Sequence, residues 1–133
     1  MRTSSLYQTK PRDFIEQADF YNMAVTGSFT GSPRELLEKI HGLEERFGRD
    51  RLHGIPKGPR TLDIDIELFG DDIIREADLV IPHERMNERQ FVLVPLLELL
   101  PDSIDPVSLV RFADIAARLP DQGVKEVGNL YGN

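Results

Sequence analysis

One segment, LDIDIEL at 62–68, limits the folds open to this chain, because its apolar and acidic residues alternate without a break. Residues i and i+2 of a β-strand point to the same side of the strand. Asp63, Asp65 and Glu67 would therefore share one face, while the leucines and isoleucines between them would lie against a core. The alternation predicts a strand over 60–68 with one acidic face and one buried face.

The rest of the sequence predicts an α+β domain, in which helices pack on one face of a mainly antiparallel sheet. A single domain over 1–133 is the simplest organisation for a chain of 133 residues. The strongest helix signal combines Ser32 as N-cap, Pro33 in the first turn and Glu35 in a capping box. The apolar residues that follow have helical spacing and predict one buried stripe: Leu36, Leu37, Ile40, Leu43 and Phe47.

Weaker signals place the remaining elements. They are a strand over 20–29, a surface loop over 48–59, a hairpin over 60–75 that turns at 70–72, a loop with a short helical piece over 77–91, a helix after Pro95, a helix over 108–119 capped by Ser108, and a polar tail after Pro120 that frays. The predicted order is therefore strand, helix, strand, strand, helix, helix.

Composition excludes some classes of function. The chain has 23 acidic and 16 basic residues and a net charge of −7, which argues against nucleic-acid or membrane binding as its main activity. It has no cysteine, so disulfides and thiolate metal sites are excluded. The first ten residues lack the apolar core of a signal peptide, and no apolar run approaches the length of a membrane span. These features predict a cytoplasmic protein.

The acidic strand face has two interpretations. Such a face is most often simply solvated, but aspartate is disfavoured in strands, which weakens that interpretation here. Two aspartates at this spacing suit hard cations such as Mg²⁺, which bind carboxylates, water and substrate phosphates. A pair of such ions about 4 Å apart can clamp a phosphoryl chain during in-line transfer.

Basic residues are concentrated just before the acidic strand, at Arg46, Arg49, Arg51, Lys57 and Arg60. Each alone would be a solvated surface charge, and Arg46 is expected to be one. Together, on a loop that leads into the acidic strand, they predict a phosphate clamp with a closing lid.

Long motifs then indicate a family resemblance. They are SSLYQTKP at 4–11, DFYNMA at 19–24, GPRTLDIDIELFG at 58–70 and PHERMNERQF at 82–91. Over about 3–101 the chain resembles the 6-hydroxymethyl-7,8-dihydropterin pyrophosphokinase (HPPK) family. The resemblance implies the family's ferredoxin-like fold. It also implies the family's reaction in folate biosynthesis, which transfers pyrophosphate from ATP to the pterin hydroxymethyl group and releases AMP.

The resemblance assigns roles residue by residue. Asp63 and Asp65 match the two aspartates that bind both magnesium ions. The arginines that handle the triphosphate correspond to Arg49, Arg51 and Arg60. Positions that contact ATP correspond to His41, Glu44, Ile66, His83 and Arg89. Positions that contact the pterin correspond to Thr9, Phe20, Asn22 and Phe91. No family role attaches to Glu67, which is expected to be a solvated carboxylate.

The chain also departs from the family pattern. The loop before the acidic strand lacks the usual tryptophan, and His41 stands where a glutamine is common. The family opens with a strand and a helix that precede the first residues matched here. Three explanations compete: a mis-assigned or shortened start, a partner chain that fills the gap, or a sheet that closes without the missing strand. We favour a mis-assigned or shortened start, with self-association through the resulting gap in the sheet.

Three other functions stay open at this point. The first is a shortened relative that binds ATP and pterin with little or no turnover. The second is another two-metal phosphoryl or nucleotidyl transferase, against which the pterin-site matches argue. The third is a structural domain with an acidic outer strand.

Overall fold

The computed structural model describes residues 1–9, 20–47 and 62–129. The chain divides into two compact units. One, which we call the sheet unit, comprises Met1–Ser28 and Glu84–Asn133. The other, the helix–hairpin unit, comprises Phe29–His83. Within the described residues, no helix is both long and apolar enough to cross a membrane.

The sheet unit is built around a three-stranded antiparallel sheet with the order β3-β2-β7. The central strand β2 (Leu6–Thr9) pairs with β3 (Phe20–Asn22) on one side and with β7 (Val124–Gly128) on the other. The prediction of a fraying tail after Pro120 is therefore wrong for residues 124–128, and residues 130–133 lie outside the described residues. Hydrogen bonds to β2 hold the backbone of β7. The sequence of the tail does not predict this strand, because its apolar and polar residues do not alternate clearly.

The predicted strand over 20–29 is interrupted. It forms β3 and then β4 (Val25–Thr26), which pairs in a separate two-stranded sheet with β1 (Arg2–Thr3). Between the two strands, Ala24 donates its N–H to the Ser4 Oγ at 2.8 Å and accepts the Ser4 N–H at 2.8 Å. Ser4 is fully buried, and its side chain provides one of the bonds that a continuous ladder would otherwise make.

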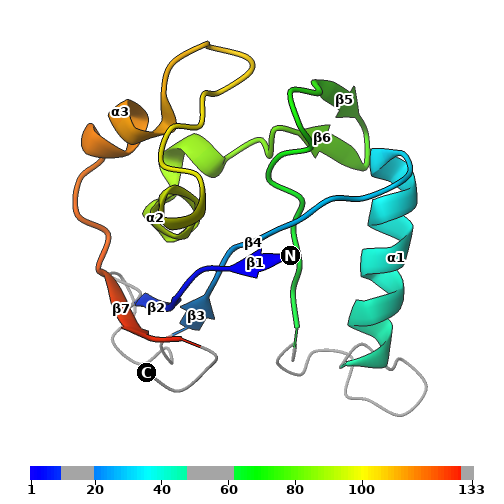
Figure 1. Cartoon of the computed structure of the whole chain (residues 1–133), viewed down its shortest axis with the longest axis horizontal. Coiled ribbons are helices and arrows are strands. Elements are labelled where there is room, and N and C mark those ends of the chain that lie inside the picture. Colours follow the sequence, from blue (N-terminus) through cyan, green and yellow to red (C-terminus); the bar gives the residue numbers. More distant parts are fainter. Residues whose placement is uncertain (10–19, 48–61, 130–133) are drawn as a thin grey trace. The chain divides into compact units, whose positions relative to one another are not determined.

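Helix α2 (Gln90–Leu99) covers one face of the sheet, and α3 (Phe112–Ala117) packs against α2 (Figure 1). A single 3₁₀ turn, η1 (Met86–Glu88), precedes α2. It lies within 77–91, where a short helical piece was predicted. Helix α2 begins before Pro95, not after it as predicted. Leu93, Pro95, Leu96 and Leu99 are buried on one side of the helix, and this burial outweighs the loss of one backbone donor at the proline. The core of the unit consists of Tyr7, Met86, Leu93, Leu96, Leu99 and Phe112.

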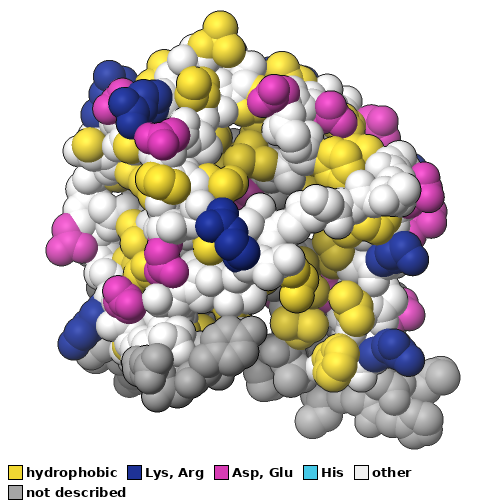
Figure 2. All heavy atoms as spheres, viewed as in Figure 1, with side chains coloured by type: hydrophobic (Ala, Val, Ile, Leu, Met, Phe, Trp, Pro, Cys, Tyr) yellow, Lys and Arg dark blue, Asp and Glu magenta, His cyan; other side chains and the backbone are white. Residues whose placement is uncertain are grey.

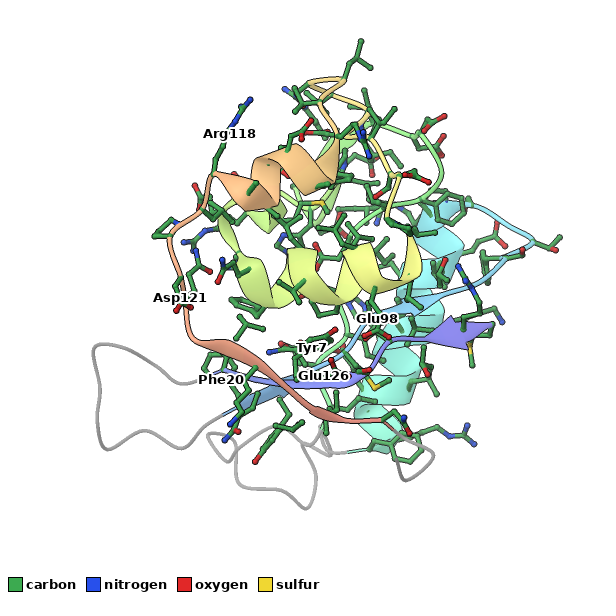
Figure 3. All side chains as sticks on the ribbon, turned by 60° about the vertical axis from the view of Figure 1, so that its left-hand side comes forward. Tyr7, Phe20, Glu98, Arg118, Asp121 and Glu126 are labelled. Atoms are coloured by element: carbon green, nitrogen blue, oxygen red, sulfur yellow. The ribbon has the colours of Figure 1, made fainter. Side chains whose placement is uncertain are left out.

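Tyr7 links the sheet to α2. Its hydroxyl donates to the Glu98 Oε1 at 2.6 Å, and the Glu98 Oε2 accepts the Ser5 N–H at 2.8 Å (Figure 3). Burial, followed by the bond to Glu98, raises the pKa of the Tyr7 hydroxyl. For Glu98, burial alone would raise the pKa, but the hydrogen bonds from Tyr7 and Ser5 outweigh it and hold the pKa below its ordinary value.

The loop between α2 and α3 is organised by a buried carboxylate, Asp105. It accepts the Val107 N–H at 2.9 Å, the Asn87 amide at 3.0 Å and the Ser108 hydroxyl at 3.0 Å. Ser108 is thus not the cap of the following helix, and α3 starts later than predicted because the loop uses these residues. Leu109 has a φ of 62° and is 76% exposed. Figure 2 shows hydrophobic side chains on this loop, at the top of the view.

The helix–hairpin unit starts with α1 (Pro33–Arg46), whose predicted capping box is present. The Ser32 Oγ accepts the Glu35 N–H at 3.1 Å, and the Glu35 carboxylate accepts the Ser32 N–H at 3.1 Å. The predicted buried stripe is only partly correct. Ile40 is buried, but Leu43 and Phe47 are 41% and 56% exposed, and the last turn buries Glu44 instead.

The hairpin of this unit lies later in the chain than predicted. Its strands are β5 (Ile74–Glu76) and β6 (Leu79–Ile81), and Arg34 of α1 binds the two carboxylates at its turn, Glu76 and Asp78. The predicted turn at 70–72 is present: the Asp72 N–H donates to the Phe69 carbonyl at 3.0 Å, and Gly70 has a φ of 55°.

The acidic segment 62–69 pairs with no strand in the described part of the chain, so the predicted strand is wrong there. Its backbone makes other bonds. The Ile64 N–H donates to the Glu44 carboxylate at 3.0 Å, and the Glu67 carbonyl accepts the His83 N–H at 2.9 Å. The Glu44 side chain and the His83 amide therefore bond to a segment that has no β-ladder within the described part of the chain.

Candidate functional site

A polar cavity of about 290 Å³ lies in the helix–hairpin unit. Its wall comes from α1, the acidic segment, β6 and the residue just after β6. Many residues that the sequence assigned to ATP or magnesium line this one cavity: His41, Glu44, Asp63, Asp65, Ile66 and His83. Leu37, Ile64, Leu79 and Val80 complete the lining. Residues from three separate stretches of sequence thus meet around a space of ligand-binding size.

Glu44 positions the acidic segment. It is only 3% exposed, and its Oε2 accepts the Ile64 N–H, which lies between the two aspartates. A buried carboxylate is held in place by such a bond, and the bond fixes the backbone from which Asp63 and Asp65 project. The resemblance suggested an ATP contact for Glu44. The structure gives it a positioning contact at the wall of the cavity.

Two side chains of the acidic segment and one from just after β6 come together beside the cavity. One ligand atom each from Asp65, Glu67 and His83 lies within 4.8 Å of the others. Asp65 is exposed, whereas Glu67 and His83 are half-buried. Glu67 is therefore not the solvated carboxylate that the sequence predicted, and its Oε2 is shielded from solvent. Its position two residues after Asp65 could have indicated that the two side chains lie close together, but no family motif assigned Glu67 a role.

The residues assigned to the pterin lie in the sheet unit, on β2, β3 and α2. Thr9 and Phe20 are paired across β2 and β3. The rings of Phe20 and Phe91 meet edge to face with centroids 6.0 Å apart. The guanidinium of Arg89, predicted to contact ATP, lies 5.5 Å from the centre of the Phe91 ring. Asn22 lies two residues along β3 from Phe20, and Figure 3 labels Phe20 at the end of the sheet.

Two buried polar atoms stand out in this group. The Thr9 Oγ1 and the Asn22 Nδ2 have no hydrogen-bond partner within the described part of the chain. Thr9 is only 5% exposed. Buried polar groups in proteins are nearly always satisfied, so these two are suited to bonding a ligand. They lie next to aromatic faces, which is the combination that a flat heterocycle needs.

Of the basic residues predicted to form the phosphate clamp, Arg46 ends α1 and is exposed, as expected. Arg49, Arg51, Lys57 and Arg60 lie outside the described residues.

Comparison with known proteins identifies the family. The family model for 7,8-dihydro-6-hydroxymethylpterin-pyrophosphokinase (HPPK) matches residues 1–101. The chain belongs to the HPPK family. The predicted resemblance is thus confirmed, and the mixed α+β structure with antiparallel sheets is consistent with the HPPK fold.

Named relatives agree with the HPPK match. A 2-amino-4-hydroxy-6-hydroxymethyldihydropteridine pyrophosphokinase of Synechocystis sp. is 42% identical over 133 residues, covering 96% of this chain and 67% of the relative. A protein of the same name from Haemophilus influenzae is 41% identical over 118 residues, which cover 84% of this chain and 72% of the relative. The folic acid synthesis protein fol1 of Pneumocystis carinii is 38% identical over 127 residues, which cover 96% of this chain and 17% of the relative.

The chain thus spans about two thirds of the separate HPPK enzymes and less than a fifth of fol1. The HPPK family uses ATP as a substrate, generally with Mg²⁺, and binds the pterin. The names of these relatives describe pyrophosphokinases and folate-synthesis proteins.

Proposed function

We propose that this chain transfers pyrophosphate from ATP to 6-hydroxymethyl-7,8-dihydropterin and releases AMP. The observation that carries the proposal is the gathering of Asp63, Asp65, His41 and His83 around one polar cavity, in a chain that belongs to the HPPK family. Phosphoryl-type transfer depends on positioning and charge neutralisation, which is what such a cavity supplies.

The reaction needs one bond to form and one to break. The hydroxymethyl oxygen of the pterin attacks the β-phosphorus of ATP. The bond between that phosphorus and the α,β-bridging oxygen breaks, AMP leaves with the bridging oxygen, and the hydroxyl proton is released to solvent. The sequence offers no obvious general base for this proton, so the chain's contribution is to bind and orient the two substrates.

The donor atoms at the cavity fit magnesium. Asp63 and Asp65 present carboxylate oxygens, which are the ligands that this hard cation prefers. We assign two ions to this pair, as the family resemblance implies. When bound, the ions would neutralise the triphosphate and polarise its oxygens. His41, Ile66, His83 and Arg89 are the proposed ATP contacts, Glu44 supports them, and Arg49, Arg51 and Arg60 are the proposed triphosphate arginines.

The pterin is assigned to Thr9, Phe20, Asn22 and Phe91. The Thr9 hydroxyl and the Asn22 amide would bond the polar edge of the ring, which would satisfy two buried atoms that have no partner in the described residues. Phe20 and Phe91 would contact its flat surface. A cytoplasmic location and self-association stay predictions.

The direct test is AMP formation. Purified chain is incubated with ATP, Mg²⁺ and 6-hydroxymethyl-7,8-dihydropterin, and AMP and the pterin pyrophosphate are separated by chromatography. We expect both products in equal amounts. Reactions without pterin, or with a nucleoside monophosphate as acceptor, test for a different two-metal transferase. The proposal fails if AMP appears only with the nucleotide acceptor, or if neither product forms.

A further inference from the structure

The acidic segment contains one carboxylate that the proposed reaction does not use. Asp63 and Asp65 are assigned to magnesium, but Glu67 has no role in that assignment. The structure places Glu67 with Asp65 and with His83, a residue 16 positions further along the chain, and the ligand atoms of all three lie within 4.8 Å of one another. Glu67 therefore belongs to a mixed nitrogen and oxygen cluster and not to a solvated row of acids.

The spacing of these atoms is close to that of a metal site. With metal–ligand bonds of about 2.0–2.2 Å, neighbouring ligand atoms lie roughly 3–4 Å apart. Donor atoms within 4.8 Å of one another would need to approach by only about an ångström, which side-chain rotation can supply. Two of the three residues are already fixed relative to each other, because the His83 N–H donates to the Glu67 carbonyl at 2.9 Å.

Charge favours a divalent ion at this place. The two carboxylates contribute two negative charges, which one divalent cation cancels. Glu67 and His83 are half-buried and Asp65 is exposed, so an ion can enter from solvent.

The donor set decides which ion. Magnesium prefers an all-oxygen shell with several waters, whereas imidazole nitrogen suits first-row transition ions. We propose that Asp65, Glu67 and His83 form a cation site that takes Mn²⁺, Co²⁺ or Zn²⁺ in preference to Mg²⁺. The inference deepens the proposed function, on which it rests, because Asp65 would also serve the magnesium pair. A transition ion at this cluster would thus share a ligand with the triphosphate-binding ions.

The first test measures metal binding alone, without ATP or pterin. Titration calorimetry of the full chain with MnCl₂ is compared with MgCl₂. We expect Mn²⁺ to bind more tightly, and Glu67→Gln and His83→Asn each to weaken Mn²⁺ binding by about tenfold or more. Matched controls are Glu38→Gln, an exposed acid of α1, and His41→Asn, a histidine that lines the cavity outside the cluster. Both should bind Mn²⁺ like the unsubstituted chain.

A second test needs no variant, so that a folding defect cannot obscure it. The ring nitrogens of the unsubstituted, ¹⁵N-labelled chain are observed by NMR during Zn²⁺ addition. We expect one ring nitrogen of His83 to shift while those of His41 stay in place. Unchanged His83 nitrogens, or Mn²⁺ binding insensitive to Glu67→Gln, would overturn the inference. Because neither readout uses turnover, a failed AMP assay with a responding His83 would refute the proposed function alone.

Discussion

Asp65 is the residue at which the two metal assignments meet, since it belongs to the proposed magnesium pair and to the cluster with Glu67 and His83. We predict that Asp65→Ala lowers the rate of AMP formation by at least about a hundredfold, because losing a ligand of a catalytic ion removes several kcal/mol of charge stabilisation. The side chain is exposed, so the urea midpoint of unfolding should hardly change.

The control for this prediction is Asp71→Ala. Asp71 is an exposed acid on the turn after the same segment, and its removal changes the net charge equally. It should keep full activity. An active Asp65→Ala chain would contradict the assignment, as would an Asp71→Ala chain that is equally impaired.

Tyr7 is a second residue whose side chain should have a measurable effect, in this case on the free energy of unfolding. The residue is buried, and its hydroxyl donates to the Glu98 carboxylate at 2.6 Å. We predict that Tyr7→Phe lowers the free energy of unfolding by about 1–3 kcal/mol, as expected for a bond to a charged group. Tyr21→Phe, at a tyrosine that is 57% exposed, should change it by less than about 0.5 kcal/mol.

The same bond has a defined pH dependence. The pKa of Glu98 is lowered in the folded chain, so its bonds contribute stability above the ordinary glutamate pKa of about 4.3. This contribution is lost as the pH falls through the lowered pKa. The difference between the parent chain and Tyr7→Phe should therefore shrink below about pH 4 in urea titrations. A difference that stays constant down to pH 2 would contradict the pairing.

At the scale of elements, the stability of α1 depends on the capping of its first turn. The capping box satisfies two backbone groups through Ser32 and Glu35. We predict that Ser32→Ala lowers the stability of α1 by about 1 kcal/mol, measured by hydrogen exchange of its amides. Thr30→Ala, at an exposed residue two positions earlier, is the control. Equal losses in the two variants would mean that the cap does not stabilise this helix.

The elements also separate what sequence can predict from what it cannot. The cap of α1 was predicted because its residues are neighbours in sequence. The acidic segment alternates as a strand does, yet a strand also needs a partner, and none of the described residues supplies one. Strand β7 is the reverse case. Its sequence has no clear strand pattern, but β2, more than a hundred residues earlier in the chain, pairs with it.

The candidate site divides in the same way. The positions around the cavity followed from motifs, and the structure brings them together from α1, the acidic segment and the end of β6. Glu67 was missed because its meaning depends on His83, which lies beside it only after the chain folds. The positioning role of Glu44 was likewise hidden, since its partner is a backbone N–H.

At the scale of the whole molecule, β7 closes one edge of the sheet unit. We predict that a chain ending at Gly123 loses hydrogen-exchange protection in β2, whose outer edge then lacks its partner. The α1 amides, in the helix–hairpin unit, are the internal control and should keep their protection. Equal loss in α1 would contradict the independence of the units and favour the single cooperative domain that the sequence predicts.

The bond between Tyr7 and Glu98 also has an optical consequence. The chain has three tyrosines and no tryptophan, so its intrinsic emission under ultraviolet light comes from phenol rings. A phenol that donates to a carboxylate can pass its proton to that partner in the excited state, and it then emits weakly at the usual tyrosine wavelength. Tyr7 should therefore be dim in the folded chain, and unfolding in urea should brighten the protein, with Tyr7→Phe removing much of the increase.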